Sequence, residues 1–367
     1  MAAKETARGT AKETAKEKAL AVGNRLGVKL IPRLPDGVKR LASGGRALTI
    51  DGNTLDPALQ MMLAAQRAGG LDGLVVNDDP VATRANSAEL TRSLDEPDVH
   101  VAGTRSWSIP GPIGSIAARQ YLPPAGDTPP ALLVFYHGGG FVFGDLESHD
   151  AACRLICRDA GVSVLAIDYR MAPEHPAPAA VNDAYAAYIW ARTHADGLGV
   201  DPRRVAVGGD SAGGCLAAVV TRLARDAGEP MPSVQWLIYP VTDMRGKTPS
   251  RTLFGEGLLL TKHDMDWFQA LYLKDSGLDV TDPLVSPGLA EDLTGLSPAL
   301  VVTAGFDPLR DEGDQYAARL RAAGVPVDHR KMNAMTHAFL NLNALGGGVS
   351  RANTEMISAL RAHLSRS

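Results

Sequence analysis

From residue 131 onwards the chain alternates short apolar runs with segments of helical pattern. The apolar runs are rich in β-branched residues and read ALLVFYH, VSVLAIDY, RVAVGGD, VQWLIYP, ALVVTAGFD and VPVDHRKM. Helical segments that separate or follow them include 176–194, 212–227, 312–323 and 350–364. Strands that alternate with helices form a mostly parallel sheet covered by helices on both faces. The alternation therefore predicts an α/β fold.

Two stretches depart from this alternation. Residues 44–100 show helical spacing around Leu59 and Leu63, and residues 243–290 hold a helical KHDMDWFQALYL without a clear strand. Insertions at the end of a sheet commonly form lids. We therefore expect four parts: an N-terminal extension at 1–43, a helical cap at 44–100, a cap insertion at 243–290, and a catalytic domain at 101–242 and 291–367.

The N-terminal extension begins with a charged repeat, MAAKETARGTAKETAKEK, which favours helix but has almost nothing large to bury. The role of this repeat stays open. Residues 19–41 then space leucines among basic side chains, as amphipathic helices do. We favour a helix that packs on the main domain. The alternative is peripheral contact with an anionic membrane surface.

Composition and charge argue against several function classes. The net charge of the 367-residue chain is -4, which does not favour nucleic-acid binding. The sequence shows neither an apolar run of membrane-spanning length nor a hydrophobic signal core. Its three cysteines, Cys153, Cys157 and Cys215, form no disulfide framework, and no third metal ligand accompanies the first two. We expect a cytoplasmic protein with reduced, buried thiols and no metal.

A glycine-rich turn joins the predicted strand at 204–207 to the predicted helix at 212–227. It contains Gly209-x-Ser211-x-Gly213, the pattern of a nucleophile elbow. Small residues allow a tight strand-to-helix turn that exposes the serine hydroxyl, and free N–H groups at the helix start favour developing negative charge. The pattern predicts Ser211 as a nucleophile.

A serine nucleophile needs a base, and the base needs an acid that orients it. Among nine histidines, His337 stands on a loop after a predicted strand and downstream of the serine, where this fold places its base. The segment after ALVVTAGF offers four carboxyl groups: Asp307, Asp311, Glu312 and Asp314. Asp307 follows the strand directly, whereas Asp311 is typical of a helix N-cap. We therefore predict Ser211, Asp307 and His337, in that chain order.

The apolar run LLVFY ends in a histidine followed by three glycines, His137-Gly138-Gly139-Gly140. Acyl transfer creates an oxyanion, which needs backbone donors where the charge appears. Glycines present their N–H groups without side-chain bulk, so the loop is predicted to bind the oxyanion. No Gly-Lys-Ser/Thr follows, which argues against a phosphate loop. We interpret His137 as a structural residue.

Taken together, the motifs resemble one known family. HGGGFVFGD, DYRMAPEHPAPAA, GGDSAGG, AGFDPLRDEG and MTHAFLN stand in the order of the bacterial hormone-sensitive-lipase-like esterases of the α/β-hydrolase superfamily. The resemblance implies an α/β-hydrolase fold and hydrolysis of short- to medium-chain carboxylic esters, without cofactor or metal. Asp210 places the chain in the Gly-Asp-Ser-Ala-Gly subgroup.

The same resemblance implies residue roles. Ser211 is the nucleophile, His337 the base and Asp307 its orienting acid. The N–H groups of Gly139, Gly140 and Ala212 form the oxyanion hole. Arg170 and Glu174 form a buried structural pair beside the site. One residue departs from the family: Cys215 stands where asparagine is usual.

Three functions compete at this stage. The first is a serine carboxylesterase acting on a small-molecule ester. The second is a lipase at lipid–water interfaces, with residues 19–41 on the membrane. The third is a non-catalytic ligand receptor. Plant receptors that resemble this fold have lost the catalytic histidine, so the presence of His337 argues against this function. The sequence does not give the oligomeric state, and a homodimer is kept as one alternative.

Overall fold

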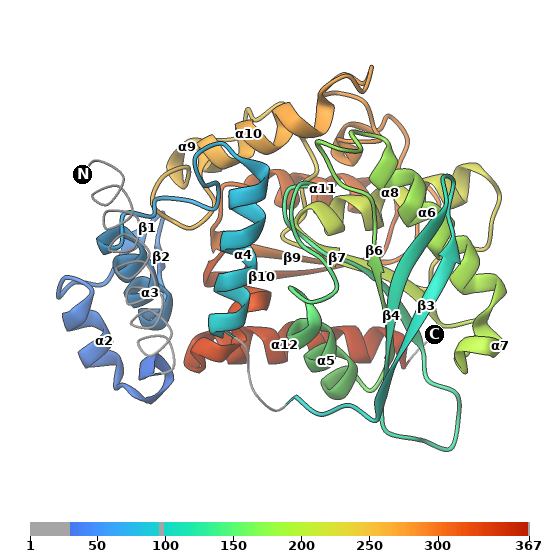
Figure 1. The fold of residues 1–367 in the computed structure, drawn as a ribbon, viewed down its shortest axis with the longest axis horizontal. Helices are drawn as coiled ribbons and strands as arrows, with labels where there is room; N and C mark the ends of the chain where they lie inside the picture. Colours follow the sequence, from blue (N-terminus) through green and yellow to red (C-terminus); the bar gives the residue numbers. More distant parts are fainter. Residues whose placement is uncertain (1–29, 95–98, 366–367) are drawn as a thin grey trace, which may run out of the picture.

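The computed structural model of the chain describes residues 30–94 and 99–365. The charged repeat at 1–18 and residues 19–29 of the amphipathic segment therefore lie outside the described residues. In the described part, one twisted central sheet lies between two layers of helices (Figure 1).

The central sheet has eight strands within the described residues, in the order β10-β9-β8-β7-β5-β6-β4-β3. Their bounds are β3 Gly103–Pro110, β4 Ser115–Leu122, β5 Leu132–Tyr136, β6 Ser163–Asp168, β7 Val205–Asp210, β8 Gln235–Ile238, β9 Ala299–Phe306 and β10 Val327–Thr336. Strand β4 pairs antiparallel with β3 and β6, and the other pairs are parallel. The predicted mostly parallel sheet is confirmed.

Helices cover both faces of this sheet. The helices α6 (Ala179–Thr193), α8 (Ala212–Asp226) and α11 (Arg310–Ala322) pack on one face, and α5 (Asp150–Ala160) and α12 (Gly347–Leu364) pack on the other (Figure 1). The strands β5 and β7 are buried along their whole length, as expected of strands covered on two sides. No helix within the described residues has the length and hydropathy to cross a bilayer.

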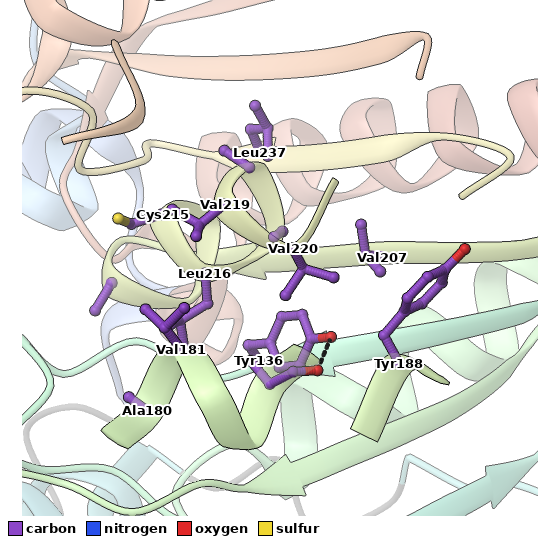
Figure 2. Close-up of a cluster of buried hydrophobic side chains, with 14 of the residues drawn as sticks. Tyr136, Ala180, Val181, Tyr188, Val207, Cys215, Leu216, Val219, Val220 and Leu237 are labelled. Carbon is purple, nitrogen blue, oxygen red and sulfur yellow. Dashed lines mark hydrogen bonds between the residues drawn. The ribbon is translucent and has the colours of Figure 1, made fainter. Parts of the chain in front are cut away.

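The helix α8 is the central packing element behind the elbow. Its Leu216, Val219 and Val220 are fully buried and pack near Tyr136 and Val207 of the sheet (Figure 2). Burying one such aliphatic side chain stabilises the folded state by about 1.5–3 kcal/mol. This packing fixes the direction of α8, and therefore the position of the residue at its start.

The N-terminal elements lie in two different places. The first group, η1 (Ile31–Arg33), α2 (Asp36–Ala42), the hairpin β1 (Thr49–Ile50) with β2 (Asn53–Thr54), and α3 (Pro57–Ala68), packs together, and α3 also packs on α12. The helix α4 (Pro80–Leu94) lies separately, near η3 (Phe339–Leu345). The hairpin was not expected in a segment with helical spacing.

The insertion between β8 and β9 carries α9 (Pro249–Leu253), α10 (Lys262–Leu273) and η2 (Pro287–Leu289). The helix α10 begins with a capping box between Thr261 and Asp264, which satisfies N–H groups at the helix start. The buried Asp264 carboxylate also accepts hydrogen bonds from the N–H groups of Leu74 and Val75, at 3.1 and 2.8 Å. One carboxylate thus joins the insertion to the N-terminal segment.

Candidate active site

Ser211 occupies a sharp turn between β7 and α8. Its backbone has φ 55° and ψ -115°, a conformation that costs energy for a residue with a side chain. The flanking glycines explain why the turn closes, because a Cβ at Gly209 or Gly213 would overlap the carbonyl oxygen of Tyr136. The predicted elbow therefore exists, and its geometry holds the serine at the start of α8.

The structure brings the three predicted triad side chains together. His337 Nε2 lies 2.9 Å from Ser211 Oγ, and His337 Nδ1 lies 2.8 Å from Asp307 Oδ2. Each residue directly follows a parallel strand, and these strands lie close together in the sheet, so their carboxyl ends meet at one edge. All three side chains are buried, and Asp307 is 0% exposed.

The other carboxyl groups considered from the sequence have different partners. Asp311 accepts from the Ser250 N–H, Glu312 pairs with Arg251, and Asp314 binds His329 and Lys331. Asp307 Oδ1 accepts from the Leu309 N–H at 2.8 Å, which leaves Oδ2 to the histidine. The prediction that Asp311 is the N-cap of α11 is wrong, because the helix begins at Arg310 and its N-cap is Leu309.

The three-glycine loop has backbone torsions that favour glycine and leaves no room for side chains, as expected. Gly139 and Gly140 have φ of 116° and 61°, in the region that favours glycine. A Cβ at Gly139 would overlap the carbonyl oxygen of Phe143, and one at Gly140 would overlap the ring of Phe268. Within the described residues, the N–H groups of Gly139, Gly140 and Ala212 donate to no protein acceptor. These amides are therefore available to a developing oxyanion.

Beneath this loop lies a buried polar group that sequence reasoning did not assign. Asp210 Oδ1 accepts from the Gly138 N–H at 2.8 Å and lies 3.2 Å from His149 Nε2. Burial raises the pKa of Asp210, but the charge and hydrogen bond of His149 and the Gly138 amide outweigh it, so the pKa lies below its usual value. Only the position of Asp210 inside the elbow motif signalled it.

His137 is a structural residue in the loop. Its ring stacks on Tyr169 at 4.3 Å, and its Nδ1 lies 2.8 Å from the carbonyl oxygen of Gly138. Burial, and next the neighbouring His149, lowers the pKa of His137 to about 4. The side chain is therefore neutral near pH 7 and holds the loop, in agreement with the sequence-based interpretation.

A cavity of about 160 Å³ opens at Ser211. Its walls are mainly apolar and come from the N-terminal segment as well as the insertion, with Leu74, Leu90, Met244, Leu260, Met265 and Phe268 among the lining side chains. The helix α3 contributes none of the lining residues within the described part of the chain. Among the described residues of the 44–100 segment, those that reach the site therefore begin at Leu74.

The predicted pair of Arg170 with Glu174 is wrong. Arg170 instead makes two hydrogen bonds to the buried Asp183, at 2.8 and 2.7 Å. Glu174 is exposed and pairs with Arg84 of α4. The local motif could not reveal either partner, because Asp183 and Arg84 lie on helices outside it.

The cysteines and potential metal ligands offer no further site. Cys153, Cys157 and Cys215 are free and buried, and Cys215 Sγ lies 3.5 Å from the carbonyl oxygen of Val285. Burial raises the pKa of Cys215 above its ordinary value, so the thiol stays protonated. Among the described residues, no three histidine, cysteine or carboxylate side chains gather where they could hold a metal ion.

Comparison with known proteins identifies the family. A family model described as the alpha/beta hydrolase fold matches residues 133–341, more than half of the chain. The chain belongs to the α/β-hydrolase family. The matched range contains the three-glycine loop, Ser211, Asp307 and His337. The resemblance drawn from the motifs is confirmed.

Similar proteins match most of the length of this α/β-hydrolase. A carboxylic ester hydrolase of Mycobacterium tuberculosis, LipN, is 59% identical over 346 residues, which are 93% of this chain and 92% of the relative. The ethyl acetate hydrolase of Pseudomonas putida is 36% identical over 314 residues, 83% and 97% of the two chains. The solved structure of ester hydrolase EH1AB1 from the Lake Arreo metagenome has a TM-score of 0.79 at 40% identity, covering 85% of this chain and 99% of the other.

Proposed function

We propose that this carboxylic ester hydrolase works through Ser211 as nucleophile, His337 as base and Asp307 as the acid that orients the base. The continuous line of hydrogen bonds from Asp307 to His337 to Ser211, at 2.8 and 2.9 Å, is the observation that carries the proposal. The Ser211 hydroxyl attacks the ester carbonyl while His337 Nε2 takes its proton. Asp307 holds Nδ1–H and stabilises the imidazolium that forms.

The reaction then passes through two tetrahedral states. In the first, the former carbonyl oxygen carries negative charge, and the N–H groups of Gly139, Gly140 and Ala212 are the proposed donors to it. Collapse breaks the bond to the alcohol, which leaves with the proton from His337, and Ser211 keeps the acyl group. Water, deprotonated by the same histidine, then releases the carboxylic acid.

The substrate class that fits the site is an ester with a short to medium acyl chain. The cavity of about 160 Å³ is mainly apolar and small, so it favours a few methylene groups over a long chain. Each buried methylene adds about 0.8 kcal/mol of binding until the cavity is full. The name of the relative from Pseudomonas putida, an ethyl acetate hydrolase, supports the same size range.

We propose further that two segments form the cap over this cavity. Both the part of 44–100 that begins at Leu74 and the insertion at 243–290 supply lining residues. The hydrogen bonds from Leu74 and Val75 to Asp264 join the two segments. The sequence-based boundaries of the extension, the cap and the catalytic domain are retained as part of this proposal, except that α3 packs on α12 and is not part of the cap.

The nucleophile assignment is tested by labelling and substitution together. Diethyl p-nitrophenyl phosphate should phosphorylate one residue, identified as Ser211 by peptide mass spectrometry. Ser211→Ala should lower kcat for p-nitrophenyl butyrate by at least about 10³-fold, because triad members act as a unit. Ser276→Ala, in the cap insertion, is the matched control and should keep full activity. Labelling at another residue, or normal turnover by Ser211→Ala, would refute the assignment.

A second candidate, action on lipid esters at a membrane, is favoured by one surface feature. Three large apolar side chains near the N-terminus face solvent: Leu30 is 54%, Val38 45% and Leu41 75% exposed. Basic side chains stand beside them in sequence, which suits an anionic membrane. The rate with tributyrin, measured across its solubility limit with and without anionic vesicles, separates the two. A lipase accelerates at the limit, and the esterase that we favour does not.

The cytoplasm remains the proposed compartment, because the free buried thiols suit a reducing environment. Peripheral membrane attachment is checked by flotation of the protein with anionic vesicles. The homodimer stays an alternative that the sequence leaves open, and sedimentation velocity of the full chain tests it.

A further inference from the structure

One face of the helix α4 lines the catalytic cavity. Ser87, Leu90 and Thr91 are all lining residues, and their spacing of three and four residues places them on the same side of the helix. The hydroxyls of Ser87 and Thr91 are therefore one turn apart, beside Leu90. Two hydroxyl groups thus stand where a helix that only covers an apolar cavity would carry apolar side chains.

Neither hydroxyl has a protein partner in the described part of the chain. Serine and threonine in a helix can donate to the carbonyl oxygen one turn earlier, as Thr221 does to Ala217 at 2.8 Å. Among the described residues, Ser87 and Thr91 make neither this bond nor another hydrogen bond. Each hydroxyl can therefore donate to, and accept from, a group in the cavity.

The helix α4 packs against η3, which holds a third group of this kind. Asn341 of η3 lines the same cavity, and its Oδ1 is buried without a partner among the described residues. Its Nδ2 lies 3.3 Å from His149 Nε2. An unpaired acceptor costs free energy that a donor from a ligand can recover. The α4 and η3 sides of the cavity thus offer two hydroxyls and one amide oxygen.

Proton transfer decides which part of an ester meets these groups. His337 passes its proton to the leaving alcohol, so the alcohol oxygen lies within hydrogen-bond reach of Nε2. His337 stands two residues before η3, so the alcohol part begins beside the wall that η3 and α4 form. The acyl part is left to the insertion, whose Met244, Leu260 and Met265 line the cavity with apolar surface.

We propose that α4 and η3 form an alcohol subsite for esters whose alcohol carries further hydroxyl groups, such as monoesters of a diol or a triol. Ser87 and Thr91 exchange hydrogen bonds with these hydroxyls, Leu90 packs on the carbon chain, and Asn341 Oδ1 accepts a hydrogen bond. This inference rests on the proposed function, because it concerns the ester that Ser211 attacks. It assigns the alcohol half of the substrate, about which the acyl preference says nothing.

The test compares two butyrate esters that differ only in hydroxyl groups, propyl butyrate and 2,3-dihydroxypropyl butyrate. The full-length enzyme is assayed by titration of the released butyric acid, and each rate is divided by that of alkaline hydrolysis of the same ester. The kcat/KM for the dihydroxypropyl ester should be higher by at least about tenfold, because a site built to hydrogen-bond a hydroxyl disfavours the analogue that lacks it. A ratio below about twofold, less than one hydrogen bond supplies, would overturn the subsite.

Substitutions on α4 assign the preference to the two hydroxyls. Ser87→Ala and Thr91→Val each remove one hydroxyl at nearly constant size, and each should lower the ratio by about three- to tenfold. Thr91→Ser keeps a hydroxyl and should retain most of the ratio. Asn86→Ala is the matched control, because Asn86 lies on α4 but does not line the cavity, and it should keep the ratio of the unsubstituted enzyme. A merely structural role of the hydroxyls predicts equal losses with both esters, and an unchanged ratio in Ser87→Ala and Thr91→Val would therefore refute the subsite.

A third ester, propyl 3-hydroxybutyrate, carries its hydroxyl on the acyl side. If this ester gained as much over propyl butyrate and lost the gain in Thr91→Val, the polar wall would bind the acyl part and the proposal would be wrong. Labelling with diethyl p-nitrophenyl phosphate separates such a failure from that of the proposed function. A labelled Ser211 together with an unfavourable ratio sinks only the subsite, whereas an unlabelled Ser211 sinks the proposed nucleophile.

Discussion

Arg84 of α4 donates to both carboxylate oxygens of Glu174, at 2.8 and 2.7 Å, and so links the proposed cap to the loop after β6. The same guanidinium donates to the carbonyl oxygens of Val142 and Ala172, at 2.8 and 2.9 Å. Val142 is the second residue after the oxyanion loop. One arginine therefore holds α4 over the cavity by four hydrogen bonds.

Loss of this link should loosen the cap more than it destabilises the fold. Arg84→Ala is expected to raise KM for p-nitrophenyl butyrate by about three- to tenfold, whereas a half-exposed ion pair contributes at most about 1 kcal/mol to stability. Arg84→Lys should recover only part of the effect, since lysine cannot make the bidentate contact. Steady-state kinetics and melting curves check both. An unchanged KM in Arg84→Ala would show that α4 needs no such link.

The strained backbone of Ser211 predicts a trade between stability and activity. Ser211→Gly should raise the free energy of unfolding by about 1 kcal/mol while abolishing turnover, because glycine adopts φ 55° without strain. Ser211→Ala abolishes turnover equally but keeps the strain, so it should bring no such gain. Urea unfolding of the three proteins measures the difference. Equal stabilities of the two variants would contradict strain at this position.

The glycines of the oxyanion loop should differ in how they can be rescued. Gly140→Ala is expected to reduce kcat by about 10²-fold, because its new Cβ displaces the donor by overlapping the Phe268 ring. Phe268→Ala in the same chain should restore part of the rate, since a side chain is removed. Gly139→Ala clashes with backbone at Phe143 and should gain nothing from Phe268→Ala. Kinetics of these variants, with Phe268→Ala alone as the control, decide the matter.

The neutral His137 predicts a loss of stability in acid. Its pKa is about 4 in the folded protein and 6.5 in the unfolded chain, so the unfolded chain binds the extra proton first as the pH falls. The contribution is complete above pH 6.5 and is lost towards pH 4, with a size of about 3 kcal/mol. His137→Asn should flatten the dependence of the unfolding free energy on pH. The unfolding free energy of both proteins is measured by urea unfolding at pH 7, 6 and 5. An equal decrease with falling pH in the two proteins would contradict this prediction.

The sheet and the site were predictable because both depend on local patterns. A buried parallel strand is a continuous apolar run, and a parallel partner requires a helix between two such runs, so β5 to β9 could be located without knowing their neighbours. The elbow and the three-glycine loop were visible for a similar reason. Their backbones need glycine at specific steps, as the overlaps at Gly139, Gly209 and Gly213 show.

Some elements had no such local signature. The strand β3 is an edge strand with most of its side chains partly or fully exposed, so it lacks an apolar run. The helix α3 has an ordinary amphipathic face, which does not state whether it covers the cavity or packs on α12. Edge strands and the partners of amphipathic helices are decided by the surfaces that remain uncovered when the core has formed.

The sequence by itself therefore determined the alternation of elements, the nucleophile elbow and the chain order of Ser211, Asp307 and His337. Only the tertiary structure decided which polar side chains meet: Arg170 with Asp183, and His149 with Asp210. The reason is physical. Backbone torsions and apolar periodicity act within a few residues along the chain, whereas an ion pair joins side chains that folding brings together from distant segments.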